Sequence, residues 1–251
     1  MTAELYVVAD GEKYVYSFEF NMIHIHDTGD KIIEPTCTEK GYTLHGCTCD
    51  TSAYKDTYTP ALGHEFVDGK CTRCGIDVLD AFTDVKRDSY CADAVQWAVA
   101  NGITKGTDAT HFSPNAGCTR GQVVTFLWRA AGEPTVGGNV GFVDVAPGSY
   151  CYEAVKWAVA NGITKGTDAT HFSPNAGCTR GQVVTFMYRA EGEPAVGGSN
   201  GFVDVAPGSY CYEAVKWTVA NGITKGTDAT HFSPNATCTR GQVVTFLYRA
   251  Q

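Results

Sequence analysis

The chain has 251 residues, of which 43% are hydrophobic and 18% are charged. Its formal net charge is 19 − 27 = −8, and residues 1–80, with 14 acidic and 6 basic side chains, carry all of it. No run of Lys and Arg occurs, which argues against nucleic acid as the main partner. The longest apolar runs are far shorter than the roughly 18–20 residues that cross a bilayer, so no membrane span is expected.

The cysteine content indicates an exported protein. Residues 1–20 show no basic region followed by an apolar one, so they are not a signal peptide. The 11 cysteines are nevertheless heavy usage for a cytosolic protein. Both observations fit a mature or excised piece of a longer secreted protein, and we expect an extracellular location.

Residues 1–27 alternate weakly between apolar and polar side chains. Leu5 and Val7 share one face of a first run, and the aromatic residues between Tyr14 and Phe20 share one face of a second. This pattern predicts two strands joined by a turn at Asp10-Gly11. Two strands alone are marginally stable, so this segment is interpreted as the tail of a truncated β-domain or as a hairpin that packs on the next part of the chain.

Residues 28–79 are rich in cysteine and too short for a sizeable core. One hypothesis is a tetrahedral zinc site, because a Cys-x-x-Cys knuckle is followed by glycine and preceded by a shortened Cys-x-Cys pair. The ligands would be Cys47, Cys49, Cys71 and Cys74, with His64 in reserve. The alternative is a disulfide knot, which would leave one of five cysteines odd. The His24-x-His26 pair is interpreted as a solvated strand edge.

A 60-residue repeat dominates the rest of the chain. Phe142–Ala190 recurs as Phe202–Ala250 with three differences, whereas the first copy, Phe82–Ala130, is more divergent. Gly/Pro-rich segments between the copies are typical of linkers. The sequence therefore predicts repeats at residues 80–131, 141–191 and 201–251.

Each repeat is predicted to form a helix, a loop and a second helix. In the second copy Ser149 is a plausible N-cap for a helix over Tyr150–Ala160, and Asn161-Gly162 ends it. Thr179 and Gln182 form a capping box at the start of the second helix. Such short helices cannot bury their apolar faces alone, so the three units should pack together.

Five short motifs recur in the same order in every copy. In the second they are Phe142-Val-Asp144-Val, Tyr152-Glu-Ala154-Val-Lys-Trp157, Gly162-Ile-Thr-Lys-Gly166, Phe172-Ser-Pro174 and Thr179-Arg180-Gly-Gln182. In this order they resemble the S-layer homology (SLH) module, and residues 28–79 resemble small Cys-rich repeats found beside such modules. The resemblance implies a mainly α fold, a pseudo-threefold trimer of helix-loop-helix repeats. It also implies anchoring to the cell envelope through a secondary cell-wall polysaccharide that often carries pyruvate ketals.

The sequence departs from the family at its signature. The usual Thr-Arg-Ala-Glu is Thr-Arg-Gly-Gln in all three copies. Glutamine can still complete a capping box, so the helix start should survive. The loss of a negative charge beside the arginine is expected to alter the ligand preference.

Residue chemistry and the resemblance together predict glycan-binding grooves. An arginine at the first helical position lies at the positive end of the helix dipole and can grip a carboxylate with two hydrogen bonds. Loop lysines add charge, loop glycines permit close approach, and tryptophans can stack on a sugar. The candidate residues are Arg120, Arg180, Arg240, Trp97, Trp157, Trp217, Lys105, Lys165, Lys225, Gly106, Gly166 and Gly226.

Other interpretations of these residues are open. Each arginine can instead pair with the aspartate of its repeat, the tryptophans are more often core residues, and loop lysines are often merely solvated. His111, His171 and His231 are interpreted as loop residues, and no nucleophile or carboxylate pair has suitable spacing. No catalytic residue is predicted.

Two cysteines fall in each repeat, 27 residues apart. They are Cys91 and Cys118, Cys151 and Cys178, and Cys211 and Cys238. Disulfides within each copy are preferred, and each would contribute roughly 3 kcal/mol through chain entropy. A cyclic scheme, Cys118–Cys151, Cys178–Cys211 and Cys238–Cys91, is also consistent with the repeat, and so are buried thiols.

The predicted function is a non-catalytic anchor that binds an anionic, pyruvylated wall polysaccharide through arginine-bearing grooves between repeats. One alternative is an adhesive or self-assembling surface protein that binds protein or host ligands. Another is the wall-attachment tail of an upstream enzyme. The expected location is the cell wall or surface layer, and zinc within residues 47–74 is the one cofactor considered.

Overall fold

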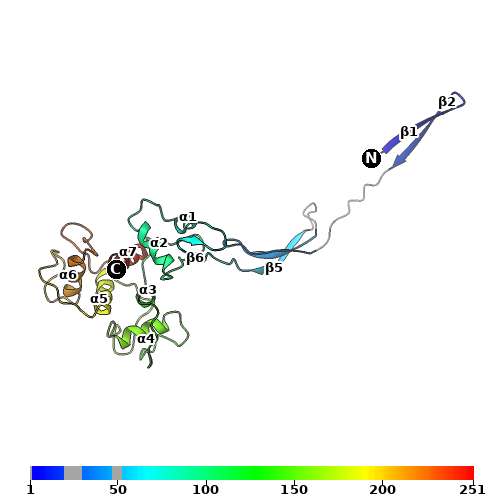
Figure 1. Cartoon of the computed structure of the whole chain (residues 1–251). Coiled ribbons are helices and arrows are strands. Elements are labelled where there is room, and N and C mark those ends of the chain that lie inside the picture. Colours follow the sequence, from blue (N-terminus) through cyan, green and yellow to red (C-terminus); the bar gives the residue numbers. More distant parts are fainter. Residues whose placement is uncertain (1, 20–29, 47–52) are drawn as a thin grey trace. The chain divides into compact units, whose positions relative to one another are not determined.

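A computed structural model of the chain describes residues 2–19, 30–46 and 53–251 (Figure 1). The chain divides into two compact units, Met1–Leu62 and Gly63–Gln251. The division between Leu62 and Gly63 falls inside the Cys-rich module that the sequence predicts over residues 28–79. The predicted domain boundaries are not tested by this division.

A two-stranded hairpin begins the first unit. Strands β1 (Thr2–Ala9) and β2 (Glu12–Glu19) pair antiparallel, as predicted. Asp10 and Gly11 both have positive φ, 54° and 85°, which is the conformation that a two-residue type I′ turn requires. Phe20, assigned to the second strand from the sequence, lies outside the described residues.

The first unit also contains a three-stranded antiparallel sheet. Its order is β3 (Lys31–Ile33), β4 (Gly41–His45), β5 (Tyr54–Thr59). Gly41 is required in β4, because a Cβ there would lie 2.4 Å from Oγ1 of Thr59 and 2.7 Å from the ring of Pro35.

The second unit begins with a small hairpin that carries the cysteine knuckle. Strands β6 (Phe66–Val67) and β7 (Lys70–Cys71) pair antiparallel. The chain then turns back, and the amide of Gly75 donates to the carbonyl of Cys71 at 2.8 Å. Helix α1 (Val78–Ala81) comes next and is capped by the Asp77 side chain.

Six helices form the three repeats. They are α2 (Ala92–Ala100) and α3 (Arg120–Ala130), α4 (Tyr152–Ala160) and α5 (Arg180–Ala190), and α6 (Tyr212–Ala220) and α7 (Arg240–Arg249). The predicted capping box is confirmed in all three second helices. Asn161 is the C-cap of α4, as predicted, and Gly162 after it has a φ of 68°, the left-handed conformation expected at a helix end.

The predicted start of the first helix was wrong by two residues. Helix α4 begins at Tyr152, with Cys151 rather than Ser149 as N-cap. The reason is a separate turn, in which the amide of Tyr152 donates to the carbonyl of Ser149 at 3.0 Å.

The three repeats pack together in cyclic order, as their short apolar faces require. The second helix of each repeat packs on the first helix of the next: α3 on α4, α5 on α6, and α7 back on α2 (Figure 1). Backbone hydrogen bonds of 2.8–2.9 Å close a ring around the three repeats. The amide of Cys118 donates to the carbonyl of Cys238, that of Cys178 to Cys118, and that of Cys238 to Cys178.

An aspartate fixes the loop of each repeat. The carboxylate of Asp144 accepts from the amides of Phe172 and Ser173 at 2.9 and 2.7 Å. The rings of Phe142 and Phe172 lie 6.0 Å apart, and Phe172 is fully buried. This holds the long loop against its own repeat and determines where the loop's polar side chains lie. Among the described residues, no helix has the length and apolar character needed to span a membrane.

Candidate functional site

Two grooves on the second unit gather side chains from all three repeats. The first has a volume of about 370 Å³. Its lining combines a loop and helix of the first repeat with one tyrosine of the second and one arginine of the third. The lining residues are Thr104, Lys105, Gly106, Gln122, Thr125, Phe126, Arg129, Tyr150 and Arg240.

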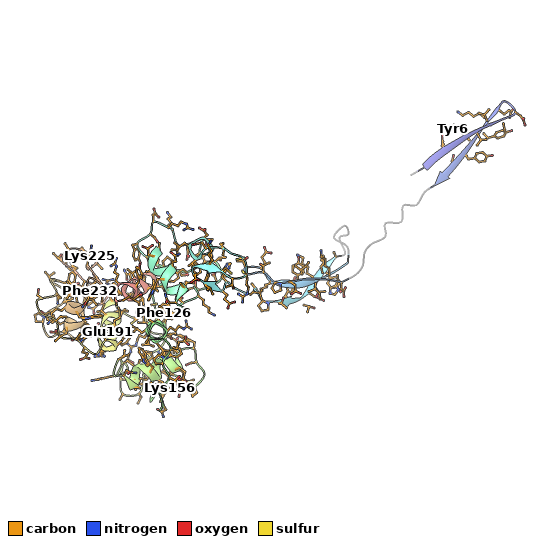
Figure 2. The ribbon with its side chains drawn as sticks, in the orientation of Figure 1. Tyr6, Phe126, Lys156, Glu191, Lys225 and Phe232 are labelled. Atoms are coloured by element: carbon orange, nitrogen blue, oxygen red, sulfur yellow. The ribbon has the colours of Figure 1, made fainter. Side chains whose placement is uncertain are left out.

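The second groove, of about 400 Å³, repeats this arrangement one step around the ring. Lys225 lies in the loop of the third repeat (Figure 2). The lining residues are Tyr90, Arg180, Thr224, Lys225, Gly226, Thr227, Gln242, Thr245, Phe246 and Arg249. The second repeat has the same residue types at the matching positions, with Lys165, Gln182, Arg189, Tyr210 and Arg120.

Both grooves carry positive charge only. The first is lined by Lys105, Arg129 and Arg240, and neither lining contains an aspartate or a glutamate. A concave surface lined by one sign of charge concentrates ions of the opposite sign. The grooves are therefore suited to an anionic ligand.

The predicted arginines are buried cations that span two repeats. Arg180 is 3% exposed, and its Nε donates to the carbonyl of Phe232 at 2.9 Å. Its guanidinium carbon lies 4.7 Å from the centre of the Phe232 ring and 5.3 Å from that of Phe246. Cation–π contacts of this kind stabilise a guanidinium that has lost water.

Two of the three arginines have a buried hydrogen-bond donor without a partner among the described residues. The donor is Nη2 of Arg120 and of Arg180. In Arg240 the same nitrogen donates to Oγ1 of Thr104 at 3.3 Å. A buried unpartnered donor is costly and rare, so each one calls for an explanation such as a ligand or a water.

The alternative of an Arg–Asp pair within a repeat is not seen in the described part of the chain. Asp84, Asp144 and Asp204 accept from loop amides instead. Burial lowers the pKa of Arg120, and the nearby Cys178 and Asp144 partly oppose that shift.

The helix N-terminus itself is closed to a ligand, which corrects the sequence-based mechanism. The amides of Arg120 and Gly121 donate to the carbonyls of Ala176 and Pro174 in the next repeat, both at 2.9 Å. The amide of Gln122 donates to the Thr119 hydroxyl. The arginine side chain, rather than the helix amides, is what remains to bind an anion.

The predicted loop residues have different roles. Lys105, Lys165 and Lys225 are exposed, and the first and last line the two grooves. Gly106 also lines a groove, but a Cβ there would lie 2.7 Å from the Phe82 ring and from the carbonyl of His111. Packing within the repeat therefore already requires Gly106, whose φ is 87°, and its counterparts Gly166 and Gly226 meet the same obstacles.

The predicted tryptophans do not line these two grooves. Trp97, Trp157 and Trp217 line a separate cavity of about 530 Å³ together with residues from the C-terminal ends of α3, α5 and α7. Trp157 and Trp217 are 7% and 6% exposed. Their placement fits the core interpretation, and the structure does not bring them to the arginines.

Several groove residues were not predicted from the sequence, among them a tyrosine, a glutamine and a second arginine in each groove. Tyr150 reaches the groove from the next repeat, and its hydroxyl lies 3.5 Å from that of Thr119. The one available signal was the recurrence of Ser-Tyr-Cys in every copy. The sequence predicts only a capping role for Gln122, and no motif points to Arg129.

The six repeat cysteines are buried, and no disulfide joins them in the structure. The within-repeat pairing stays a prediction. Burial raises the pKa of Cys118 to about 11 and those of Cys178 and Cys238 to about 12. The cyclic alternative likewise stays a prediction.

A possible metal-binding cluster lies at the start of the second unit. The ligand atoms of His64, Cys71 and Cys74 lie within 4.8 Å of one another, and His64 Nδ1 is 3.5 Å from the Cys74 sulfur. Burial raises the pKa of Cys71, but hydrogen bonds from the Cys74 and Glu65 backbone and the His64 side chain outweigh it, giving about 5. The other predicted ligands, Cys47 and Cys49, lie outside the described residues, as do His24 and His26.

The three repeat histidines occupy loops, as predicted. Nδ1 of His111, His171 and His231 lies 3.0–3.2 Å from the aspartate three residues earlier. Hydrogen bonds from the Thr110 amide and then His111 hold the pKa of Asp108 at about 2. These contacts shape an exposed turn within each loop.

The S-layer homology domain is the family whose model matches this chain, three times in tandem, at residues 81–124, 141–184 and 201–244. The chain belongs to this family. SLH domains are cell-wall anchoring modules, so the chain is located at the cell surface or cell wall.

The curated relatives include a surface-layer protein and two glucanases. The chain is 34% identical over 164 residues to the Surface-layer 125 kDa protein of Lysinibacillus sphaericus, covering 62% of this chain and 13% of that protein. It is 23% identical over 206 residues to the Exoglucanase XynX of Acetivibrio thermocellus, covering 80% and 19%. It is also 30% identical over 109 residues to an Endoglucanase of Bacillus sp. strain KSM-635, covering 43% and 11%. The chain thus spans less than a fifth of these relatives.

Proposed function

We propose that residues 81–251 form a pseudo-threefold module that anchors the chain by binding carboxylate groups of an anionic, pyruvylated wall polysaccharide. The observation that carries this proposal is the buried, unpartnered Nη2 of Arg120 and Arg180, together with groove linings that hold three cations and no carboxylate. The cyclic packing of α3 on α4, α5 on α6 and α7 on α2 supports the threefold arrangement.

The proposed binding uses the guanidinium as an oriented donor. Because Nε of Arg180 already donates to Phe232, the Nη groups are left for a ligand oxygen. A hydrogen bond from a charged donor contributes about 1.5–3 kcal/mol, and desolvation of the groove strengthens it. The exposed lysine of each groove, Lys105 or Lys225, then adds electrostatic attraction for the anionic ligand.

Co-sedimentation of the chain with wall sacculi tests this function. Removal of the secondary polysaccharide should abolish binding. The triple substitution of Lys105, Lys165 and Lys225 by Gln should weaken it by roughly 2- to 5-fold, the size of one exposed charge interaction per groove. A matched control replaces three exposed lysines outside the described grooves, Lys31, Lys40 and Lys86, by Gln. Binding that ignores both the polysaccharide and the groove lysines would contradict the proposal.

A second candidate function is the wall-attachment part of a longer enzyme. The names of two relatives, an exoglucanase and an endoglucanase, favour it. The groove chemistry would be the same in that case, and the sequence of the complete gene would decide between the two.

We also infer that the Cys/His cluster binds zinc. His64, Cys71 and Cys74 supply nitrogen and sulfur ligands, which zinc prefers, and structural zinc takes four. The other cysteines of residues 28–79, which are Cys37, Cys47 and Cys49, are the candidates for the fourth ligand.

Metal analysis of the purified chain tests the zinc site. The expected content is about one zinc per chain, lost in Cys71→Ser and Cys74→Ser and kept in the control Cys91→Ser. Cobalt bound in place of zinc gives a thiolate-to-metal absorption band. This band should be lost in the same variants that lose zinc and kept in the control. Among Cys37→Ser, Cys47→Ser and Cys49→Ser, the variant that loses the metal identifies the fourth ligand. A chain that binds neither metal would contradict the site.

A further inference from the structure

The hairpin that carries the cysteine knuckle packs on the first repeat. Strand β6 and helix α1 both contact helix α2 (Figure 1). The turn between β6 and β7 approaches α2 so closely that a Cβ on Gly69 would lie 3.2 Å from Nε2 of Gln96. The carbonyl of the same glycine accepts from the amide of Val78 at 2.9 Å, which connects this turn to α1. Residues 64–81, the knuckle segment, therefore cover α2 as one structural piece.

A line of aromatic rings connects the Cys/His cluster to the core of the first repeat. The ring centre of His64 lies 5.5 Å from that of Phe66, which lies 6.3 Å from that of Phe82. The ring of Phe82 in turn lies 6.0 Å from that of Phe112, which is fully buried. The first ring belongs to a candidate metal ligand and the last to the repeat core. The position of the ligand is therefore coupled to the core through packed side chains.

One phenylalanine of the repeat is more deeply buried in the first copy than in the others. Phe82 is 2% exposed, whereas its counterparts Phe142 and Phe202 are only partly buried. Each of the three rings packs on the loop phenylalanine of its own repeat at 5.9–6.0 Å. The contact that the first copy adds is the ring of Phe66. The knuckle segment thus covers apolar surface that stays partly open in the other repeats.

Residues that distinguish the first copy lie against the knuckle segment. Arg87 stands where the other copies have proline, and its Nη2 lies 2.7 Å from Oδ1 of Asp80 in α1. Gln96 stands where they have lysine, and it faces Gly69. Ala92 stands where they have tyrosine, and at 2% exposure it leaves no free space for a tyrosine. The divergence of the first copy therefore forms a docking surface.

We infer that the knuckle segment is a metal-dependent clamp, which packs firmly on the first repeat when His64, Cys71 and Cys74 hold zinc and loosens when they do not. The inference rests on the proposed zinc site and gives that site a role. Paired strands of two residues are too short to be stable alone, and in small metal-binding domains the free energy of binding is free energy of folding. Docking and zinc binding both require the folded segment, so each favours the other by the same factor.

The loop of the first repeat lies at the end of this connection. A Cβ on Gly106 would lie 2.7 Å from the ring of Phe82, so the buried ring lies directly beneath the loop. The amide of Thr83, the next residue in the chain, donates to the carbonyl of Thr110 in the same loop at 2.9 Å. Loosening of the clamp should therefore reach the loop that carries Lys105 and leave the loops of the other two repeats unchanged.

Hydrogen exchange of the full chain, loaded with zinc and after treatment with EDTA, tests the clamp. Zinc removal should speed exchange in residues 82–96 by roughly 10-fold, within the usual range of coupling between sites. The counterpart peptides, residues 142–156 and 202–216, share one sequence that differs from the first copy, so they are an internal control and should change little. Unchanged exchange in residues 82–96 would overturn the clamp. A chain that binds no zinc would instead refute the proposed zinc site.

A second test gives the first repeat the surface of its neighbours. The double substitution Ala92→Tyr, Gln96→Lys introduces the residues with which the second repeat folds, so the first repeat should fold without the clamp. It should weaken zinc binding by about 5-fold or more, because the coupling to docking is lost. The reverse substitution in the second repeat, Tyr152→Ala with Lys156→Gln, is the control and should leave zinc affinity unchanged. Equal zinc affinity of the two variants and the unmodified chain would overturn the docking surface.

Discussion

Three buried arginines distinguish this chain at the scale of single residues. Each connects two repeats, because its Nε donates to a phenylalanine carbonyl 52 positions later, or 128 positions earlier where the ring closes. Their presence at the helix start was readable from Thr-Arg-Gly-Gln. Their burial was not, because the covering residues come from another repeat.

The ring cysteines should be chemically inert in the folded protein. Burial is the main cause that raises the pKa of Cys118, Cys178 and Cys238 to about 11–12, so these thiols are neutral at pH 8. The thiolate is the reactive form, and little of it is present at that pH. Iodoacetamide at pH 8 should label them only after denaturation. Peptide mapping by mass spectrometry is the measurement, and rapid labelling of the native chain would contradict it. Non-reducing mapping would also reveal any disulfide and its pairing.

Replacement of Gly121 by Ala should displace the tyrosine of the next repeat. The new Cβ would meet the Tyr150 hydroxyl at 2.5 Å and the Pro174 carbonyl at 3.0 Å, so we expect about 1 kcal/mol of destabilisation. Tyr150→Phe in the same chain should recover part of it. Gly137→Ala, where nothing lies within 4 Å, is the control. Denaturant unfolding measures all three, and equal stability of both alanine variants would refute this close contact.

At the scale of elements, the helix boundaries show what local sequence can predict. The capping boxes and the Asn161-Gly162 stop depend on residues within four positions of one another, and both were predicted correctly. The start of α4 was not, because a turn with its own hydrogen bond precedes the helix. The amides at the start of α3 donate to a loop more than 50 positions away, which no local pattern reveals.

The capping box should contribute measurably to stability. Thr119 accepts from the Gln122 amide, so Thr119→Ala leaves a donor without its cap and should cost about 1 kcal/mol. The exposed Thr135→Ala is the matched control and should cost little. Thermal or urea unfolding checks the difference. Identical stability would mean that the interlocking loop, rather than the cap, fixes the helix start.

For the whole molecule, the near-identity of the repeats predicts three equivalent sites. The two described grooves share their lining types, and the second repeat has the same residues at the matching positions. Occupying several sites on one polymer raises the apparent affinity without any new contact, since later binding events are intramolecular.

Stepwise loss of sites should therefore give stepwise loss of affinity. Lys105→Gln, the double variant with Lys165→Gln and the triple variant with Lys225→Gln should bind sacculi progressively more weakly. Co-sedimentation isotherms measure the series. A full loss caused by one substitution, with no effect of the other two, would show a single functional groove.

Calorimetric titration of the chain with wall polysaccharide, before and after removal of its ketal carboxylates, tests the central claim most directly. It changes the ligand and leaves the fold intact. We predict binding of the carboxylated form that weakens as salt rises, and a loss of at least 10-fold once the carboxylates are removed. Equal affinity for both forms, unaffected by salt, would contradict binding through the arginine grooves.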